Sequence, residues 1–169
     1  MSWWGKILGG TFGFMLGGPL GALMGASFGH NFDRGLGRVA SGQFESGDQE
    51  RVQAAFFTAV FSIMGHLAKA DGQVTRDEIQ MARDVMTRMN LNEQMRTTAI
   101  NLFNEGRQED FPFDEVISQF RQECHRRKHL MQMFMEILLH AAYADGHVHP
   151  QERNLLNRIR EHLGFTTLE

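Results

Sequence analysis

The chain falls into two regions with different patterns of apolar and polar positions. Residues 7–28 are uncharged, whereas from about residue 48 onward apolar residues recur every three or four positions. That spacing is typical of helices with one buried face, and no run of alternating β-branched residues indicates a strand. The sequence therefore predicts an all-α fold. The expected helices lie near residues 52–67, 76–89, 93–104, 114–126, 130–144 and 150–163.

The uncharged stretch carries glycine at every fourth position. As a helix, its 22 residues would be about 33 Å long, enough to cross the roughly 30 Å hydrocarbon core of a bilayer. Because small residues let two membrane helices approach closely, the glycine stripe also predicts a dimerisation face. We therefore expect a membrane-anchored homodimer. The glycines predicted to form the contact are Gly9, Gly13, Gly17, Gly21 and Gly25.

Two other interpretations of the glycine-rich stretch stay open. A cleaved signal peptide would have a shorter apolar core and a small-residue cleavage site. A hairpin that folds back at residues 17–19 is compatible with Pro19, because proline removes one backbone hydrogen bond. In preference to both interpretations, we predict a single transmembrane span with a mild kink.

The boundaries of the predicted regions follow from composition. Residues 1–34 form the transmembrane anchor, and residues 35–47, rich in Gly and Ser, form a flexible linker. Residues 48–169 then form one helical domain, since about 120 residues suffice for a single core. Positive charges flank the anchor on both sides, so the positive-inside rule separates the two orientations poorly. The single Cys124 is compatible with a reducing compartment, which favours a cytoplasmic domain.

Two segments of the helical region repeat one another. Residues 66–78 align without gaps on residues 140–152, with seven identities in thirteen positions. Each copy ends a helix in Ala-Asp-Gly, turns, and opens a new helix with a glutamate in its first turn. The repeat predicts two helical hairpins whose long helices pack together with pseudo-twofold symmetry. We expect the later long helix, residues 130–144, to be buried on two sides.

The acidic residues of the repeat are candidate metal ligands. They place carboxylate oxygens around two turns where helix ends leave backbone groups free, and His147 and His149 add imidazole nitrogens to the second turn. A divalent cation is the ligand that such a site would hold. The turns lack the alternating acidic positions of an EF-hand. The four candidate residues are Asp71, Glu78, Asp145 and Glu152.

A structural interpretation of the same turns competes with the metal site. Gly72 and Gly146 suit the left-handed conformation that ends a helix, and Thr75 with Glu78 has the spacing of a capping box. Pro150 suits the first position of a helix. Because capping accounts for both glutamates without a ligand, the sequence favours capping, and no cofactor is expected.

Histidines and basic residues outside the turns have simpler interpretations. His66 and His140 occupy equivalent repeat positions and are expected to be hydrogen-bonded core histidines. The basic run at residues 125–129 is typical of a solvated helix end, although near a membrane it would also suit anionic lipid.

Composition and motifs exclude several functions. The balance of 17 Lys and Arg against 20 Asp and Glu gives a net charge of −3, so nucleic acid is not an expected partner. No Ser-His-Asp spacing, no phosphate-binding loop between strand and helix, and no HExxH motif occurs. We therefore do not expect an enzyme.

Five short motifs are spread along the chain. They are Trp-Gly-Lys-Ile at residues 4–7, Gly-His-Asn-Phe-Asp at 29–33, Met-Gly-His-Leu-Ala-Lys at 64–69, Arg-Met-Asn-Leu at 88–91 and Ala-Asp-Gly-His-Val-His-Pro-Gln-Glu-Arg at 144–153. Together these motifs resemble the DjlA family of DnaJ-like membrane co-chaperones. The resemblance covers essentially the whole chain, and the middle region resembles the TerB-like class, named for tellurite-resistance protein B.

The resemblance implies a fold, a location and a partner. It implies an all-helical TerB-like bundle, an anchor in the bacterial inner membrane that crosses once and dimerises, and a cytoplasmic domain. In that family a J-domain follows, and its His-Pro-Asp loop stimulates the ATPase of DnaK. The sequence ends at Glu169 without that loop, and the His-Pro-Gln triplet at residues 149–151 lacks its aspartate. DnaK is therefore expected as a partner only if a J-domain follows. The alternative is a stand-alone TerB-like stress protein that binds a divalent metal or a small ligand.

Overall fold

A computed structural model of the chain describes residues 20, 23, 47–70, 76–91, 93–143, 146 and 148–165. These residues contain no strand, and their longer segments form six helices, so the predicted all-α fold is confirmed. The last five helices begin and end within two residues of the predicted positions. The helices are α4 (Gly47–Lys69), α5 (Arg76–Arg88), α6 (Glu93–Gly106), α7 (Phe113–Cys124), α8 (Lys128–Ala142) and α9 (Pro150–Leu163).

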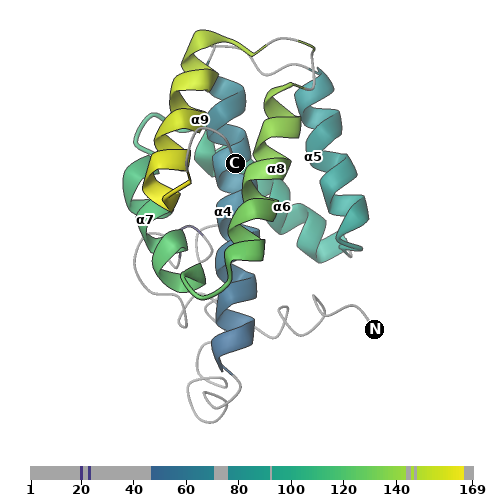
Figure 1. Ribbon diagram of the computed structural model, residues 1–169. Helices are drawn as coiled ribbons and strands as arrows, with labels where there is room; N and C mark the ends of the chain where they lie inside the picture. The colour runs from purple at the N-terminus through teal and green to yellow at the C-terminus, as the bar shows by residue number, and fades with distance from the viewer. Residues whose placement is uncertain are drawn as a thin grey trace.

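Helix α4 is the centre of the domain. The other five helices all contact it (Figure 1), and every residue from Ala55 to Gly65 is buried. A helix that is apolar on all sides must be enclosed in this way. Its polar residues are accommodated locally, since the Ser62 hydroxyl donates a hydrogen bond of 2.6 Å to the carbonyl oxygen of Thr58. The core is therefore built around one long helix.

The expectation that the later long helix is buried on two sides is wrong. Helix α8 buries Met131, Phe134 and Leu138, but it exposes Met133 and Leu139 on another face. The physical reason is that α4 already occupies the centre of the bundle. Helix α8 therefore lies on the outside of α4 and keeps one face in solvent.

The two copies of the repeat interlock. Their long helices, α4 and α8, are in contact, as predicted. Each short helix also contacts the long helix of the other copy, because α5 packs on α8 and α9 packs on α4 (Figure 1). The interlocked hairpins place the beginnings of α5 and α9 against the same part of α4.

Helices α4 and α6 approach until their backbones touch. A Cβ atom placed on Gly65 would lie 2.0 Å from the carbonyl oxygen of Phe103, and one on Gly106 would lie 1.8 Å from the carbonyl oxygen of Ser62. Carbon atoms do not approach oxygen this closely, so no side chain larger than hydrogen fits at either position. The two glycines set the distance between these helices.

The predicted anchor and linker lie almost entirely outside the described residues. All five glycines of the predicted dimerisation face are outside them, as is the linker before Gly47. Among the described residues, no helix combines the length and the apolar character needed to cross a bilayer. The boundaries of the anchor, linker and domain stay predictions.

Candidate functional site

The two repeat glutamates occupy equivalent positions in the first turns of α5 and α9. Glu78 is 4 % exposed and Glu152 is 1 % exposed. Each continues the apolar stripe of its own helix, since Glu78 precedes Ala82 by one turn and Glu152 precedes Leu156 by one turn. The helix dipole favours an acidic side chain in a first turn. The local fold therefore turns both carboxylates toward the core.

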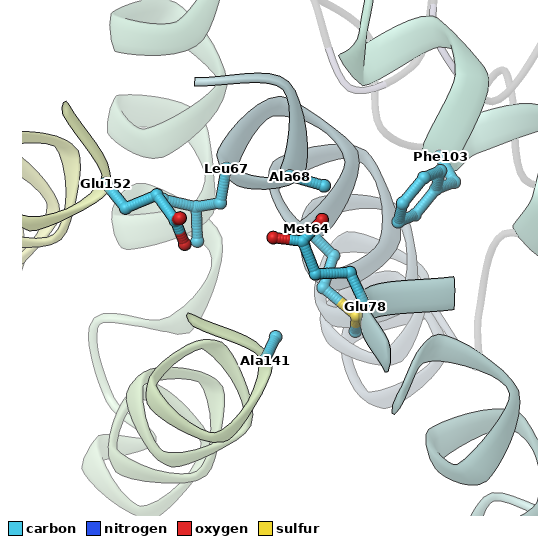
Figure 2. Close-up of a pocket in the computed structure, with 7 residues that line it drawn as sticks. All are labelled: Met64, Leu67, Ala68, Glu78, Phe103, Ala141 and Glu152. Carbon is cyan, nitrogen blue, oxygen red and sulfur yellow. The ribbon is translucent and has the colours of Figure 1, made fainter. Parts of the chain in front are cut away.

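Both glutamates line one small cavity between the two copies of the repeat. Figure 2 shows the two carboxylates pointing toward each other across the space. The cavity has a volume of about 10 Å³, which is roughly the room that one water molecule needs. It is too small for an organic ligand. Its other walls are the apolar side chains of Met64, Leu67, Ala68, Phe103 and Ala141.

The sequence predicted the position of these glutamates but not their burial. Their place in the apolar stripe was the available signal, because a carboxylate spaced like a core residue points inward. Carboxylate oxygens that face a small cavity suit a water molecule or a cation, because removing a charged group from water is costly. The geometry is therefore compatible with a structural role and with a shared small ligand.

The other residues of the predicted metal site are only partly described. Asp71 and Asp145 lie outside the described residues, as does His147. Gly146 has the predicted left-handed conformation, with φ of 83°, and Pro150 begins α9 as predicted. In the part of the chain that is described, no three His, Cys, Asp or Glu side chains form a metal-binding group. The four-residue metal site stays a prediction.

His66 and His140 differ although they are equivalent in the repeat. The Nδ1 atom of His66 lies 3.1 Å from the carbonyl oxygen of Gly106, and its ring packs on Phe111 and Phe113 at centroid distances of 5.0 Å. The prediction of a hydrogen-bonded core histidine is confirmed for His66. It is wrong for His140, which is exposed because it falls on the solvent face of α8.

The surroundings of His66 keep its ring neutral. Burial lowers the pKa of His66 below 6.5, and the charges of Lys69 and Arg158 lower it further, while the Gly106 carbonyl acts in the opposite direction. The guanidinium carbon of Arg158 lies over the Phe113 ring, 5.0 Å from its centroid. Arg158 also donates hydrogen bonds of 2.6 Å to Asp114, which links α9 to α7. His66 is thus the inner end of a packed contact between α4, α7 and α9.

We expect acid to destabilise the domain through His66. Because its folded pKa is below 6.5, the unfolded chain takes up the proton first, and stability falls as pH drops from about 6.5 to the folded pKa. The loss should be about 1 kcal/mol or less, since solvent screens a partly exposed group. Urea unfolding between pH 7.5 and 5 would measure it. His66→Gln should flatten this acid limb, whereas the exposed His129→Gln should not; equal slopes in all three proteins would contradict the assignment.

A second hollow, an open groove, lies between α5 and α6. It has a volume of about 160 Å³ and an apolar floor, with Arg83 and Arg107 among its lining residues. Ile79 and Ile100 line it and remain exposed to solvent. Phe103 lines both this groove and the glutamate cavity, so its ring separates the two hollows.

The fold and the paired glutamates define a class of protein. It is an all-helical domain in which two interlocked hairpins present equivalent acidic first turns to one core. The chain belongs to the TerB family, because the family model of tellurite resistance protein TerB matches residues 57–169. A second family model, the co-chaperone DjlA transmembrane domain, matches residues 1–39 and supports a membrane protein.

Curated relatives match nearly the whole chain. The chain is 47 % identical to co-chaperone protein DjlA of Photobacterium profundum over 170 residues, which is 96 % of the chain and 61 % of that relative. It is 44 % identical to DjlA of Vibrio cholerae, over 99 % of the chain and 61 % of the relative. It is 41 % identical to DjlA of Salmonella typhimurium, over 100 % of the chain and 62 % of the relative. The chain thus spans about 61 % of the length of these relatives. No solved structure matches it significantly.

Proposed function

We propose that this chain is the membrane-anchoring and scaffolding part of a DnaJ-like co-chaperone. The observation that carries the proposal is that one chain combines the DjlA transmembrane match with a TerB domain, and that a DjlA relative matches 96 % of it. Its role is to hold a J-domain at the membrane, where tethering raises the local concentration of the two partners. DnaK would then be the partner of that J-domain, and the chain itself would have no catalytic step.

One triplet of this chain differs from the His-Pro-Asp loop of a J-domain by lacking the aspartate, and its position supports a structural role. The His-Pro-Gln triplet at residues 149–151 begins α9, with Pro150 at the first helical position. Proline is favoured at the first position of a helix, so the triplet has a local structural role. In this proposal, stimulation of DnaK belongs to the part of the relatives' length that this chain does not span.

A hybrid protein tests the proposal. Residues 1–169 of this chain would replace the matching part of the Vibrio cholerae relative, and DnaK ATPase stimulation would be measured in membrane vesicles and in detergent. We expect the hybrid to stimulate DnaK in vesicles as well as the relative does. A hybrid lacking residues 48–169 should be less active in vesicles. If the anchor alone supports full activity, the TerB domain is not a scaffold for the J-domain.

The same proposal places the chain in the bacterial inner membrane with the domain in the cytoplasm. Phosphatase and fluorescent-protein fusions at Gly47 and Glu169 would report the orientation in cells. Fluorescence without phosphatase activity is expected at both positions. Phosphatase activity at either one would reverse the orientation.

We predict that the glycine stripe makes the anchor dimerise. Replacing Gly13, Gly17 and Gly21 with leucine should abolish most of the self-association measured by a two-hybrid assay in the membrane, because leucine keeps the helix backbones apart. A matched control replaces Leu8, Leu16 and Met24 with isoleucine, which changes apolar shape off the stripe. An unchanged signal in the glycine variant would show that the stripe is not the contact.

The second candidate function is binding of a divalent cation by the acidic turns. The observation that favours it is the pair of buried carboxylates facing one water-sized cavity. We expect the structural role to hold instead. The double variant Asp145→Asn, Glu152→Gln should then lower the free energy of unfolding by about 0.5–2 kcal/mol, with no metal effect to lose.

Thermal melting of the full chain in detergent separates these two roles. Wild type and the double variant would be melted with EDTA, Ca²⁺, Mg²⁺ or Zn²⁺. Binding of a metal to the folded state raises Tm, and the stabilisation grows with the logarithm of metal concentration over Kd. A rise of several degrees with one metal, absent in the double variant, would establish the cation site and contradict the structural role.

A further inference from the structure

Two residues of the glycine-rich stretch are part of the domain core. Leu20 is 0 % exposed and Leu23 is 7 % exposed, and both belong to the hydrophobic cluster that includes α4 and α7. The backbone N–H of Leu20 donates a hydrogen bond of 2.8 Å to Oε1 of Gln119, on α7. The chain therefore brings a segment near its beginning onto α7, 99 positions away in sequence.

This contact excludes a transmembrane position for the same residues. Leu20 lies inside the uncharged stretch at residues 7–28, and in a spanning helix its N–H must pair within the helix. A leucine in the hydrocarbon core of the bilayer is out of reach of Gln119 in a domain outside it. The docked arrangement and the membrane span are thus two alternative states of one segment.

The beginning of α4 belongs to the same buried apolar cluster as Leu20 and Leu23. Its first turns extend past the other labelled helices (Figure 1), yet Val52 and Phe56 are buried there. Phe56 packs on Phe120 of α7 at a centroid distance of 6.4 Å, so this end of α4 and α7 form one apolar surface beside Gln119. Covering such a surface with leucine side chains stabilises the docked state by about 1.5–3 kcal/mol for each leucine that is fully buried.

We propose that the surface of α4 and α7 beside Gln119 is a binding site for the chain's own glycine-rich segment. The site holds Leu20 and Leu23 while they are outside the bilayer, and it is vacated when they insert. Leucine suits this exchange, because an apolar side chain leaves water in either place. The domain thereby shields its own anchor from water before insertion.

Cross-linking of the full chain tests the two states. The pair Leu20→Cys, Gln119→Cys would be treated with a short bismaleimide after cell-free synthesis, without lipid or with vesicles of phosphatidylethanolamine and phosphatidylglycerol. The native Cys124 can stay, because burial raises the pKa of its thiol to about 12 and leaves it unreactive. The control pair, Leu20→Cys with Asp84→Cys, places the second thiol on an exposed position of α5, which lies on the opposite side of α4 from α7 (Figure 1).

We expect an intramolecular cross-link in the lipid-free chain whose yield falls about tenfold when vesicles are present, because insertion depletes the docked state. The control pair should react weakly in both conditions. Equal yields with and without lipid, equal yields in the two pairs, or products that join two chains would each overturn the proposal. Hydrogen exchange of the wild-type chain gives a reading that needs no variant: amides of α7 should be more protected without lipid, and equal protection would also overturn it.

Discussion

Gly106→Ala is expected to destabilise the domain by about 3 kcal/mol or more, as overpacking between two backbones does. The added methyl carbon would lie 1.8 Å from the carbonyl oxygen of Ser62, so α6 must move away from α4. That movement would also stretch the contact between Nδ1 of His66 and the Gly106 carbonyl. Gly65→Ala should act in the same way from the other helix. Urea unfolding of the full chain in detergent measures both.

The direction of the stability change shows whether the two helix backbones are in contact. In an ordinary helix interior, replacing glycine with alanine stabilises by up to about 1 kcal/mol, because alanine loses less entropy on folding. Gly164→Ala is the control, since that glycine has a φ of 80° and no atom near its absent Cβ. Its cost should be only about 1–2 kcal/mol, from the left-handed backbone alone. If Gly65→Ala or Gly106→Ala stabilises the protein, the two helix backbones are not in contact.

Phe103→Ala is expected to lower the free energy of unfolding by about 3–5 kcal/mol, as removal of a buried phenylalanine does. The Phe103 ring is buried and separates the glutamate cavity from the groove between α5 and α6. Its removal would join the two hollows and admit water to Glu78 and Glu152. Increased binding of an apolar dye should therefore accompany the loss of stability.

Two further variants show whether the effect of Phe103 depends on its position. Phe103→Leu should cost less than Phe103→Ala, because leucine fills part of the space and keeps the hollows apart. Ile100→Ala removes a side chain from the same helix that is 48 % exposed, so it should cost well under 1 kcal/mol. If Phe103→Ala costs no more than Ile100→Ala, the ring is not a buried wall between the hollows.

Local features of the fold were readable from the sequence because their causes lie within a few residues. Apolar spacing of three and four placed the last five helices, and Pro150 and Gly146 occupy the helix start and the left-handed turn that their own backbone preferences favour. The first helix was predicted too short, since its first residues, from Gly47 to Glu50, include no apolar position. Periodicity has no signal where a helix begins in polar residues.

The repeat could also be predicted from the sequence, but the burial of the equivalent residues in each copy could not. Equivalent sequences predicted equivalent histidines, yet His66 packs between α6 and α7 whereas His140 faces solvent. The difference arises from neighbours that the repeat does not contain: α6 and α7 follow the first copy and pack on His66, whereas in the described part of the chain no such pair covers His140. Sequence similarity specifies the element, and the surrounding elements decide its burial.

By itself, the sequence determined the all-α class, the helix positions, the internal repeat and the resemblance to the DjlA family. Only the tertiary structure decided that α4 is the central helix, that Glu78 and Glu152 face one cavity, and that Leu20 meets Gln119. The physical reason is the separation in sequence between the residues that decide each feature. Helix formation and capping depend on residues within one or two turns, whereas burial depends on which distant segments pack together, and a single apolar stripe is compatible with many partners.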